Sequence, residues 1–91
     1  MSQQYIDIEG TTVAVVVTCD GGEWSALHAD TMAYGTGRTE EDAVEALRVS
    51  MVYDKRWYCG YASDLPVIGI TAAKRTTYQR LFHCAPVEVA S

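Results

Sequence analysis

A chain of 91 residues, 48% hydrophobic and with only two prolines, is long enough for one small domain and too short for two. This composition excludes a disordered acidic tail, which lacks the apolar residues needed for a core. The longest uninterrupted apolar run, residues 13–17, is far too short to cross a bilayer. The N-terminus lacks the basic and apolar blocks of a signal peptide, so we expect a cytoplasmic protein without membrane contact.

The net charge of −5 is unevenly distributed along the chain. Residues 1–50 hold nine acidic and two basic residues, and residues 51–91 hold three acidic and five basic residues. A half with a net charge of −7 repels phosphate backbones and attracts basic protein surfaces, so the charge disfavours nucleic acid as its partner. The alternative is a solvated acidic face that serves solubility alone.

Cysteine usage predicts neither a zinc site nor a disulfide framework. The chain has three cysteines, Cys19, Cys59 and Cys84, and no closely spaced pair of the kind that structural zinc sites need. We therefore expect three buried thiols in a reducing compartment.

The first half of the chain predicts an antiparallel meander. Residues 11–19 alternate in the manner of a strand with two fairly apolar faces, which indicates a central strand. Gly21 and Gly22 suit a two-residue turn, because glycine accepts the positive φ angles that such a hairpin requires. This turn places Cys19 opposite Trp24 and Val17 opposite Ala26.

Three further short segments have strand character. Residues 31–36 would return as the next strand of the meander, and residues 67–70 form a short apolar strand later in the chain. Residues 5–8 either extend the first strand or form a short edge strand.

A long helix is predicted to begin at Thr39. Thr39 is a good N-cap residue, and three acidic residues in the first turn complement the positive end of the helix dipole. The apolar stripe Ala43, Val44, Leu47 and Met51 has helical spacing and would pack on the sheet. The helix would continue toward residue 57, where three aromatic residues four apart are expected to join the core: Tyr53, Trp57 and Tyr61.

A second helix is predicted over residues 72–84, with Thr71 as its cap. Its polar face carries Lys74, Arg75 and Arg80, which are the candidate residues for any contact with nucleic acid. The alternatives are a solvated basic face, or a face that pairs with the acidic half of a second copy.

No arrangement of residues predicts an enzyme. His83 and Cys84 are neighbours that point about 100° apart on a helix, so they cannot act as base and nucleophile. His28 fits a half-buried position in the sheet, and the carboxylates at 40–42 are too exposed to share a proton. We therefore expect no catalytic residue, no metal and no cofactor.

The segment 37–44, with the sequence GRTEEDAV, resembles the glycine-x-threonine-x-glutamate-glutamate/aspartate-alanine segment of the HicB-like antitoxin family. The apolar strand before it, the turn at residues 20–22 and the Trp24-Ser25-Ala26 stretch also resemble that family, over roughly residues 11–52. Family membership implies a β-β-β-α-β core with a partial RNase H-like fold and no nuclease activity. It also implies binding to a small basic ribonuclease toxin.

Two features depart from the family. Residues 28–32 replace its aspartate- and proline-rich turn, and roughly 20 residues follow the strand predicted at 67–70. Because these are too few for the family's C-terminal DNA-binding module, we do not expect direct DNA binding.

Together these patterns predict a single α+β domain over residues 1–91. It has an antiparallel sheet of three to four strands, one long helix packed across it and a C-terminal helix. The leading hypothesis is a non-enzymatic inhibitor of the HicB-like type that covers a basic, nucleic-acid-handling surface of a partner protein and forms a homodimer. The alternatives are a phage-encoded inhibitor of a bacterial defence complex, of the anti-CRISPR type, and a small nucleic-acid-binding module. The residues expected to contact the protein partner are Asp20, Glu23, Glu40, Glu41, Asp42, Glu45 and Trp57.

Overall fold

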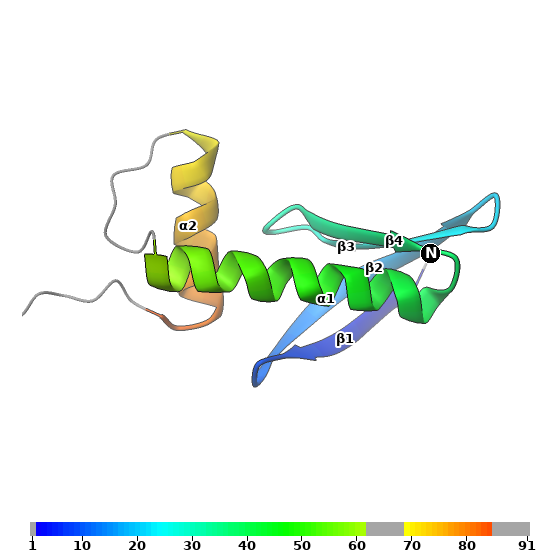
Figure 1. Cartoon of the computed structure of the whole chain (residues 1–91), viewed down its shortest axis with the longest axis horizontal. Helices are drawn as coiled ribbons and strands as arrows, with labels where there is room; N and C mark the ends of the chain where they lie inside the picture. Colours follow the sequence, from blue (N-terminus) through cyan, green and yellow to red (C-terminus); the bar gives the residue numbers. More distant parts are fainter. Residues whose placement is uncertain (1, 62–68, 85–91) are drawn as a thin grey trace, which may run out of the picture. The chain divides into compact units, whose positions relative to one another are not determined.

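The computed structural model describes residues 2–61 and 69–84 (Figure 1). Its contacts divide the chain into two compact units, Met1–Val52 and Tyr53–Ser91, within the range for which the sequence predicts one domain. Each unit is described by itself below. No helix in the described part of the chain is both long and apolar enough to cross a membrane.

The first unit is a four-stranded antiparallel sheet with a long helix, and the second contains the C-terminal helix, so the predicted α+β class is confirmed. The strands are in sequence order across the sheet: β1 (Ser2–Ile8), β2 (Thr11–Asp20), β3 (Glu23–His28) and β4 (Ala33–Gly37). All four precede the helix α1 (Glu40–Arg56). The prediction of a strand at residues 67–70 is wrong at its last residue, because Ile70 begins the helix α2 (Ile70–Leu81). Residues 67 and 68 lie outside the described residues.

The hairpin between β2 and β3 forms as predicted. Gly21 and Gly22 have φ angles of 60° and 84°, the positive values that a two-residue turn of this kind needs. The register pairs Cys19 with Trp24 and Val17 with Ala26. As a result, the valines at positions 13, 15 and 17 share one face and are all buried.

Residues 5–8 belong to the edge strand β1, which begins at Ser2 and pairs with β2 along its whole length. The turn between these strands uses Glu9 and Gly10, with φ angles of 48° and 88°. The Asp7 carboxylate accepts a hydrogen bond from the Gly10 backbone N–H at 3.3 Å, which stabilises the turn.

The strand predicted from residue 31 begins instead at Ala33. Met32 has a φ angle of 59°, a left-handed conformation that cannot continue a strand. The Thr31 hydroxyl oxygen lies 2.8 Å from His28 Nδ1 and accepts a hydrogen bond from the Ala33 N–H at 3.3 Å. His28 is buried rather than half-buried; its burial lowers its pKa, and the nearby Asp30 partly opposes this shift.

The helix α1 begins where the sequence predicts. The Thr39 hydroxyl accepts a hydrogen bond from the Asp42 backbone N–H at 3.1 Å, so Thr39 is the N-cap. Ala43, Leu47 and Met51 are fully buried and form the apolar stripe that packs on the sheet. Helix α1 ends at residue 56 and is followed by a π-helical segment, η1 (Trp57–Tyr61).

Glycines in β4 allow α1 to approach that strand closely. A Cβ atom on Gly35 would lie 2.6 Å from the Ala43 carbonyl oxygen and 2.8 Å from the Ala46 carbonyl carbon, and would also clash with the Leu47 amide nitrogen. Both distances are well below van der Waals contact. The backbone of α1 therefore rests directly on β4, where a side chain would otherwise separate them.

The second unit contains the end of α1, η1 and the helix α2 (Ile70–Leu81). Two predictions fail here. The N-cap of α2 is Gly69, without a side-chain hydrogen bond, so Thr71 lies inside the helix. Tyr53 and Trp57 are 73% and 44% exposed rather than in the core, because the side of the helix on which they lie meets solvent.

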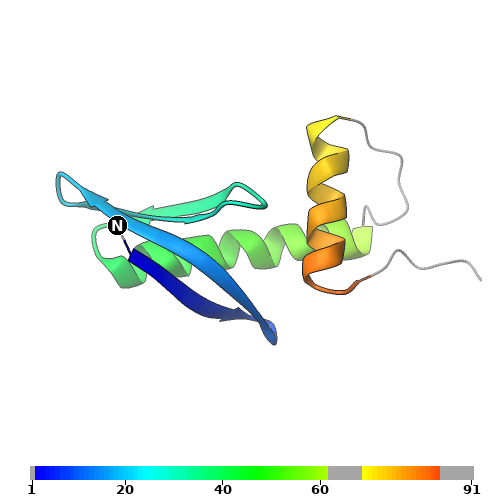
Figure 2. The same ribbon diagram turned by 180° about the vertical axis from the view of Figure 1, so that it is seen from behind.

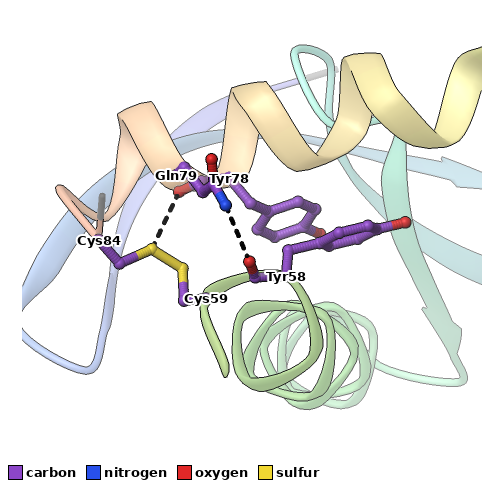
Figure 3. Close-up of a disulfide and its surroundings, with 5 residues drawn as sticks. All are labelled: Tyr58, Cys59, Tyr78, Gln79 and Cys84. Carbon is purple, nitrogen blue, oxygen red and sulfur yellow. Dashed lines mark hydrogen bonds between the residues drawn. A yellow bond between two sulfur atoms is a disulfide. The ribbon is translucent and has the colours of Figure 1, made fainter. Parts of the chain in front are cut away.

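A disulfide and two hydrogen bonds connect α2 and the residues after it to η1 and the end of α1. Figure 3 shows the disulfide and the hydrogen bond between Gln79 and Tyr58. The Cys59–Cys84 disulfide closes a loop of 25 residues, the Gln79 side chain donates to the Tyr58 carbonyl at 3.1 Å, and the Tyr78 hydroxyl donates to Asp54 at 2.9 Å. The rings of Tyr58 and Tyr78 stack with centroids 5.3 Å apart. Units this small usually need such a covalent link, because their core is too limited.

The expectation of three buried thiols is therefore wrong. Cys59 and Cys84 are oxidised to a disulfide, and Cys19, which lies near the end of β2, is exposed. An odd number of cysteines excludes only a set in which every cysteine is paired. It is compatible with one disulfide and one free thiol.

Candidate functional site

Acidic side chains gather at one end of the first unit. The register pairs Trp24 at the start of β3 with Gly37 at the end of β4, and α1 begins three residues after Gly37. The β2–β3 hairpin tip and the start of α1 therefore lie at the same end of the sheet, as Figures 1 and 2 show from opposite sides. The acidic residues at this end are Asp20, Glu23, Glu40, Glu41 and Asp42.

An open groove of about 730 Å³ lies between the edge strand β1 and the first turns of α1. Strand and helix line its two sides, and all of its lining residues belong to the first unit. The lining residues are Gln4, Ile6, Asp7, Thr39, Glu40, Glu41, Val44, Glu45 and Arg48. We call this feature the acidic groove.

The acidic groove has a strong excess of negative charge. Its lining includes four acidic residues and one basic residue, Arg48. The Arg48 guanidinium forms an ion pair with the Glu45 carboxylate one helical turn earlier, so the only cation of the groove is already engaged. Open carboxylates in this arrangement attract lysine and arginine side chains at long range.

The structure brings together only part of the predicted contact set. Glu40, Glu41 and Glu45 line the acidic groove, whereas Asp42 and the hairpin residues lie at the same end of the sheet but outside it. Trp57 belongs to the second unit, where it is 44% exposed in η1.

The sequence does not identify the β1 side of the groove. Gln4, Ile6 and Asp7 line this side. The sequence predicts there only a short edge strand or an extension of the next strand. The signal that could have revealed it is the alternation of Ile6 and Ile8 before the Glu9-Gly10 turn. Glutamate at a position with a positive φ angle hides that turn, since asparagine or glycine is usual there.

The basic residues of α2 do not form one patch. At 100° per residue, Arg80 is about 120° away from Lys74 and about 140° away from Arg75 around the helix axis. Arg80 is exposed and the other two are half-buried. This distribution fits a solvated helix better than a surface for a phosphate backbone.

The enzyme candidates likewise form no catalytic arrangement. Cys84 is in the disulfide, and the neighbouring His83 is exposed and has a φ angle of 54°. Within residues 2–61 and 69–84, no three histidine, cysteine or acidic side chains come close enough to hold a metal ion.

Comparison with known proteins adds no relative. No family model, no curated protein and no solved structure matches the chain.

Proposed function

We propose that this chain is a non-enzymatic, protein-binding inhibitor that covers a basic, nucleic-acid-handling surface of a partner protein, in the manner of the HicB-like antitoxins it resembles. The observation that carries the proposal is the acidic groove, together with the carboxylates beside it. Nucleic-acid-handling proteins display lysine and arginine on the surface that contacts phosphate. A surface of opposite charge can occupy that site and exclude the nucleic acid.

The physical steps are electrostatic attraction followed by burial of apolar contacts. Attraction between unlike surfaces raises the association rate, and this gain falls as salt screens the charges. Ile6 and Val44 line the groove together with its carboxylates and offer apolar area there. Contacts of this kind, shielded from water by a polar rim, carry most of the affinity in protein interfaces.

The test is affinity capture from the lysate of the native host, run once with and once without nuclease, with the wild-type chain and two variants as baits. The groove variant E40Q/E41Q/E45Q and the outer variant D20N/E23Q/D42N each lose three negative charges from the first unit. We expect the wild type to capture a basic nucleic-acid-handling protein and to inhibit its activity. We expect the groove variant to lose both effects and the outer variant to keep most of them.

Two results would contradict the proposal. One is capture of nucleic acid without any protein, which would favour the nucleic-acid-binding module that uses Lys74, Arg75 and Arg80. The other is a captured partner whose activity the chain leaves unchanged. If the captured partner is a subunit of a bacterial defence complex rather than a toxin, the protein is the phage-encoded inhibitor of the alternative hypothesis.

A homodimer is part of the proposal, and the sheet face opposite α1 supports it. Val16, Leu27 and Tyr34 are cross-strand neighbours on that face, and Tyr5 lies in the next row. Tyr5 and Tyr34 are 71% and 64% exposed. The acidic residues of this face, Asp7, Asp20 and Glu23, lie toward the two ends of the strands, on either side of these four residues. Two copies can meet on the uncharged middle of the face without bringing their acidic ends together. Light scattering of the wild type and of L27D measures this directly.

A cytoplasmic location belongs to the same proposal, because the proposed targets work there. The Cys59–Cys84 disulfide is the observation that opposes a cytoplasmic location, because disulfides are rare in reducing compartments. Alkylation of thiols in freshly broken cells, followed by mass spectrometry, shows whether the pair is reduced in the cell.

A further inference from the structure

The edge strand β1 is open to pairing with another strand. Among the described residues no strand lies beyond it, since the sheet order is β1-β2-β3-β4. Natural edges are commonly protected by lysine, proline or a bulge. The sequence of β1, SQQYIDI, has no lysine or proline, and its register with β2 runs without interruption from residue 2 to residue 8. This edge is therefore suited to accept an extended segment.

The turn geometry shows which backbone groups face outward. Positive φ angles at both Glu9 and Gly10 indicate a type I′ hairpin, in which the two residues flanking the turn form a hydrogen-bonded pair. Hydrogen-bonded and non-hydrogen-bonded pairs then alternate along the strand. The backbone N–H and C=O groups of Gln3, Tyr5 and Asp7 consequently face away from β2, toward the open edge.

The acidic groove lies beside this edge. Side chains alternate between the two faces of a sheet, so every second side chain of an added strand would share the face of Gln4 and Ile6, next to α1. Glu41 and Glu45 line the groove on the α1 side. Lysine or arginine at alternate positions of the added strand would meet these carboxylates.

We propose that β1 accepts an extended, basic segment of the partner protein as a fifth strand of the sheet, with its cationic side chains at alternate positions in the acidic groove. This inference rests on the proposed function and specifies how the partner is recognised. Main-chain hydrogen bonds to the edge supply affinity, and the carboxylates of the groove select the charge.

Charge decides between this occupant and two others. A second copy paired through β1 would bring two acidic grooves together, and like charges across an interface are costly. Residues 85–91 of this chain, APVEVAS, carry a single charged residue, which is acidic. Neither complements a groove in which carboxylates outnumber cations.

The test uses a synthetic seven-residue peptide with alternating arginine and β-branched residues and blocked ends. One control peptide replaces arginine with glutamate, and a second keeps every side chain but carries methylated backbone nitrogens. Each peptide is titrated into the full chain labelled with ¹⁵N, and amide exchange is followed by NMR. We expect the arginine peptide alone to bind, and new protection from exchange at the amides of Gln3, Tyr5 and Asp7.

Two variants separate the backbone contact from the side chain it carries. Tyr5→Pro removes one outward N–H and places a ring at the edge, where proline is tolerated in a folded sheet. Tyr5→Ala removes the exposed side chain and keeps the N–H. We expect Y5P to weaken peptide binding by about tenfold or more, in line with one lost hydrogen bond plus steric exclusion, and Y5A to bind as the wild type does.

The remaining outcomes overturn the inference in distinguishable ways. Binding that depends on charge but is equal in Y5P and Y5A, without new amide protection, rules out strand addition and leaves the proposed function standing. Equal binding of the methylated peptide has the same meaning. Failure of the arginine peptide to bind while the lysate partner is still captured also rules out strand addition. Failure of the lysate capture itself contradicts the proposed function.

Discussion

Replacing Gly35 with alanine tests the close packing of α1 on β4. The added Cβ would lie 2.6 Å from the Ala43 carbonyl oxygen and 2.8 Å from the Ala46 carbonyl carbon. Carbon contacts in folded proteins are about 3.5–4.0 Å, so α1 would have to retreat by roughly 1 Å. The obstructing atoms belong to the helix backbone and cannot turn aside as the end of a side chain can.

The size of the effect follows from what this retreat opens. Ala43 and Leu47 are completely buried on the face of α1 that touches the sheet. A gap of about 0.5–1 Å forfeits a quarter to a half of the dispersion energy of the contacts it separates. Overpacked cores usually lose about 1–3 kcal/mol, and we expect Gly35→Ala to fall in the upper half of that range.

Urea unfolding, followed by circular dichroism and by the fluorescence of Trp24 in β3, measures the change in the free energy of unfolding. For a domain of this size the loss would lower Tm by roughly 4–8 °C for each kcal/mol. Gly60→Ala is the matched control, because its Cβ would meet no atom within 4 Å. If the two variants unfold at the same urea concentration, α1 does not rest on β4 as described.

Three further changes have defined outcomes. Replacing both Cys59 and Cys84 with alanine should destabilise the second unit by about 3.5 kcal/mol, the loop entropy for a separation of 25 residues. Guanidinium unfolding in a Trp24→Phe background, followed by Trp57 fluorescence, measures this change. Thr39→Ala should lower the free energy of unfolding in urea by about 1 kcal/mol, because it removes the cap of α1. Thr39→Ser keeps a capping hydroxyl and should keep most of this stability. Because burial lowers the pKa of His28, the unfolded chain binds the proton more readily, so stability is full above about pH 6.5 and falls below it. His28→Gln should flatten this decline in unfolding measured at pH 7.5 and 5.5, and an equal decline in both proteins would contradict the assignment.

The sequence predicts the β2–β3 hairpin and the start of α1 residue by residue, because both depend on local chemistry. Two glycines at positive φ angles set the register of the hairpin, and the Thr39 hydroxyl sets the first turn of the helix. Each signal lies within four residues of the structure it determines. Contacts with distant residues therefore do not alter the hairpin or the start of the helix.

The elements that the sequence did not predict depend on contacts between distant residues. The Cys59–Cys84 pairing joins η1 to the segment after α2, and the composition alone allows any of three pairings. Helix α2 begins after Gly69 with no side-chain cap, so no residue marks its start. The role of Tyr53 was misjudged because helical spacing shows which side chains share a face and does not show whether another element covers that face.

The candidate site also has one part that local residues predict and one part that depends on contacts between distant residues. Its helical half was predicted because Glu40 and Glu41 follow a recognisable cap, while the β1 half required knowing that residues 2–8 pair with β2. The groove itself is a consequence of how α1 is placed. Since Gly35 and Gly37 let the helix backbone press onto β4, the helix is held at that edge of the sheet, and the opposite edge strand keeps an open space beside the carboxylates. The residues that make α1 pack closely on one edge thus leave the other edge available for a partner.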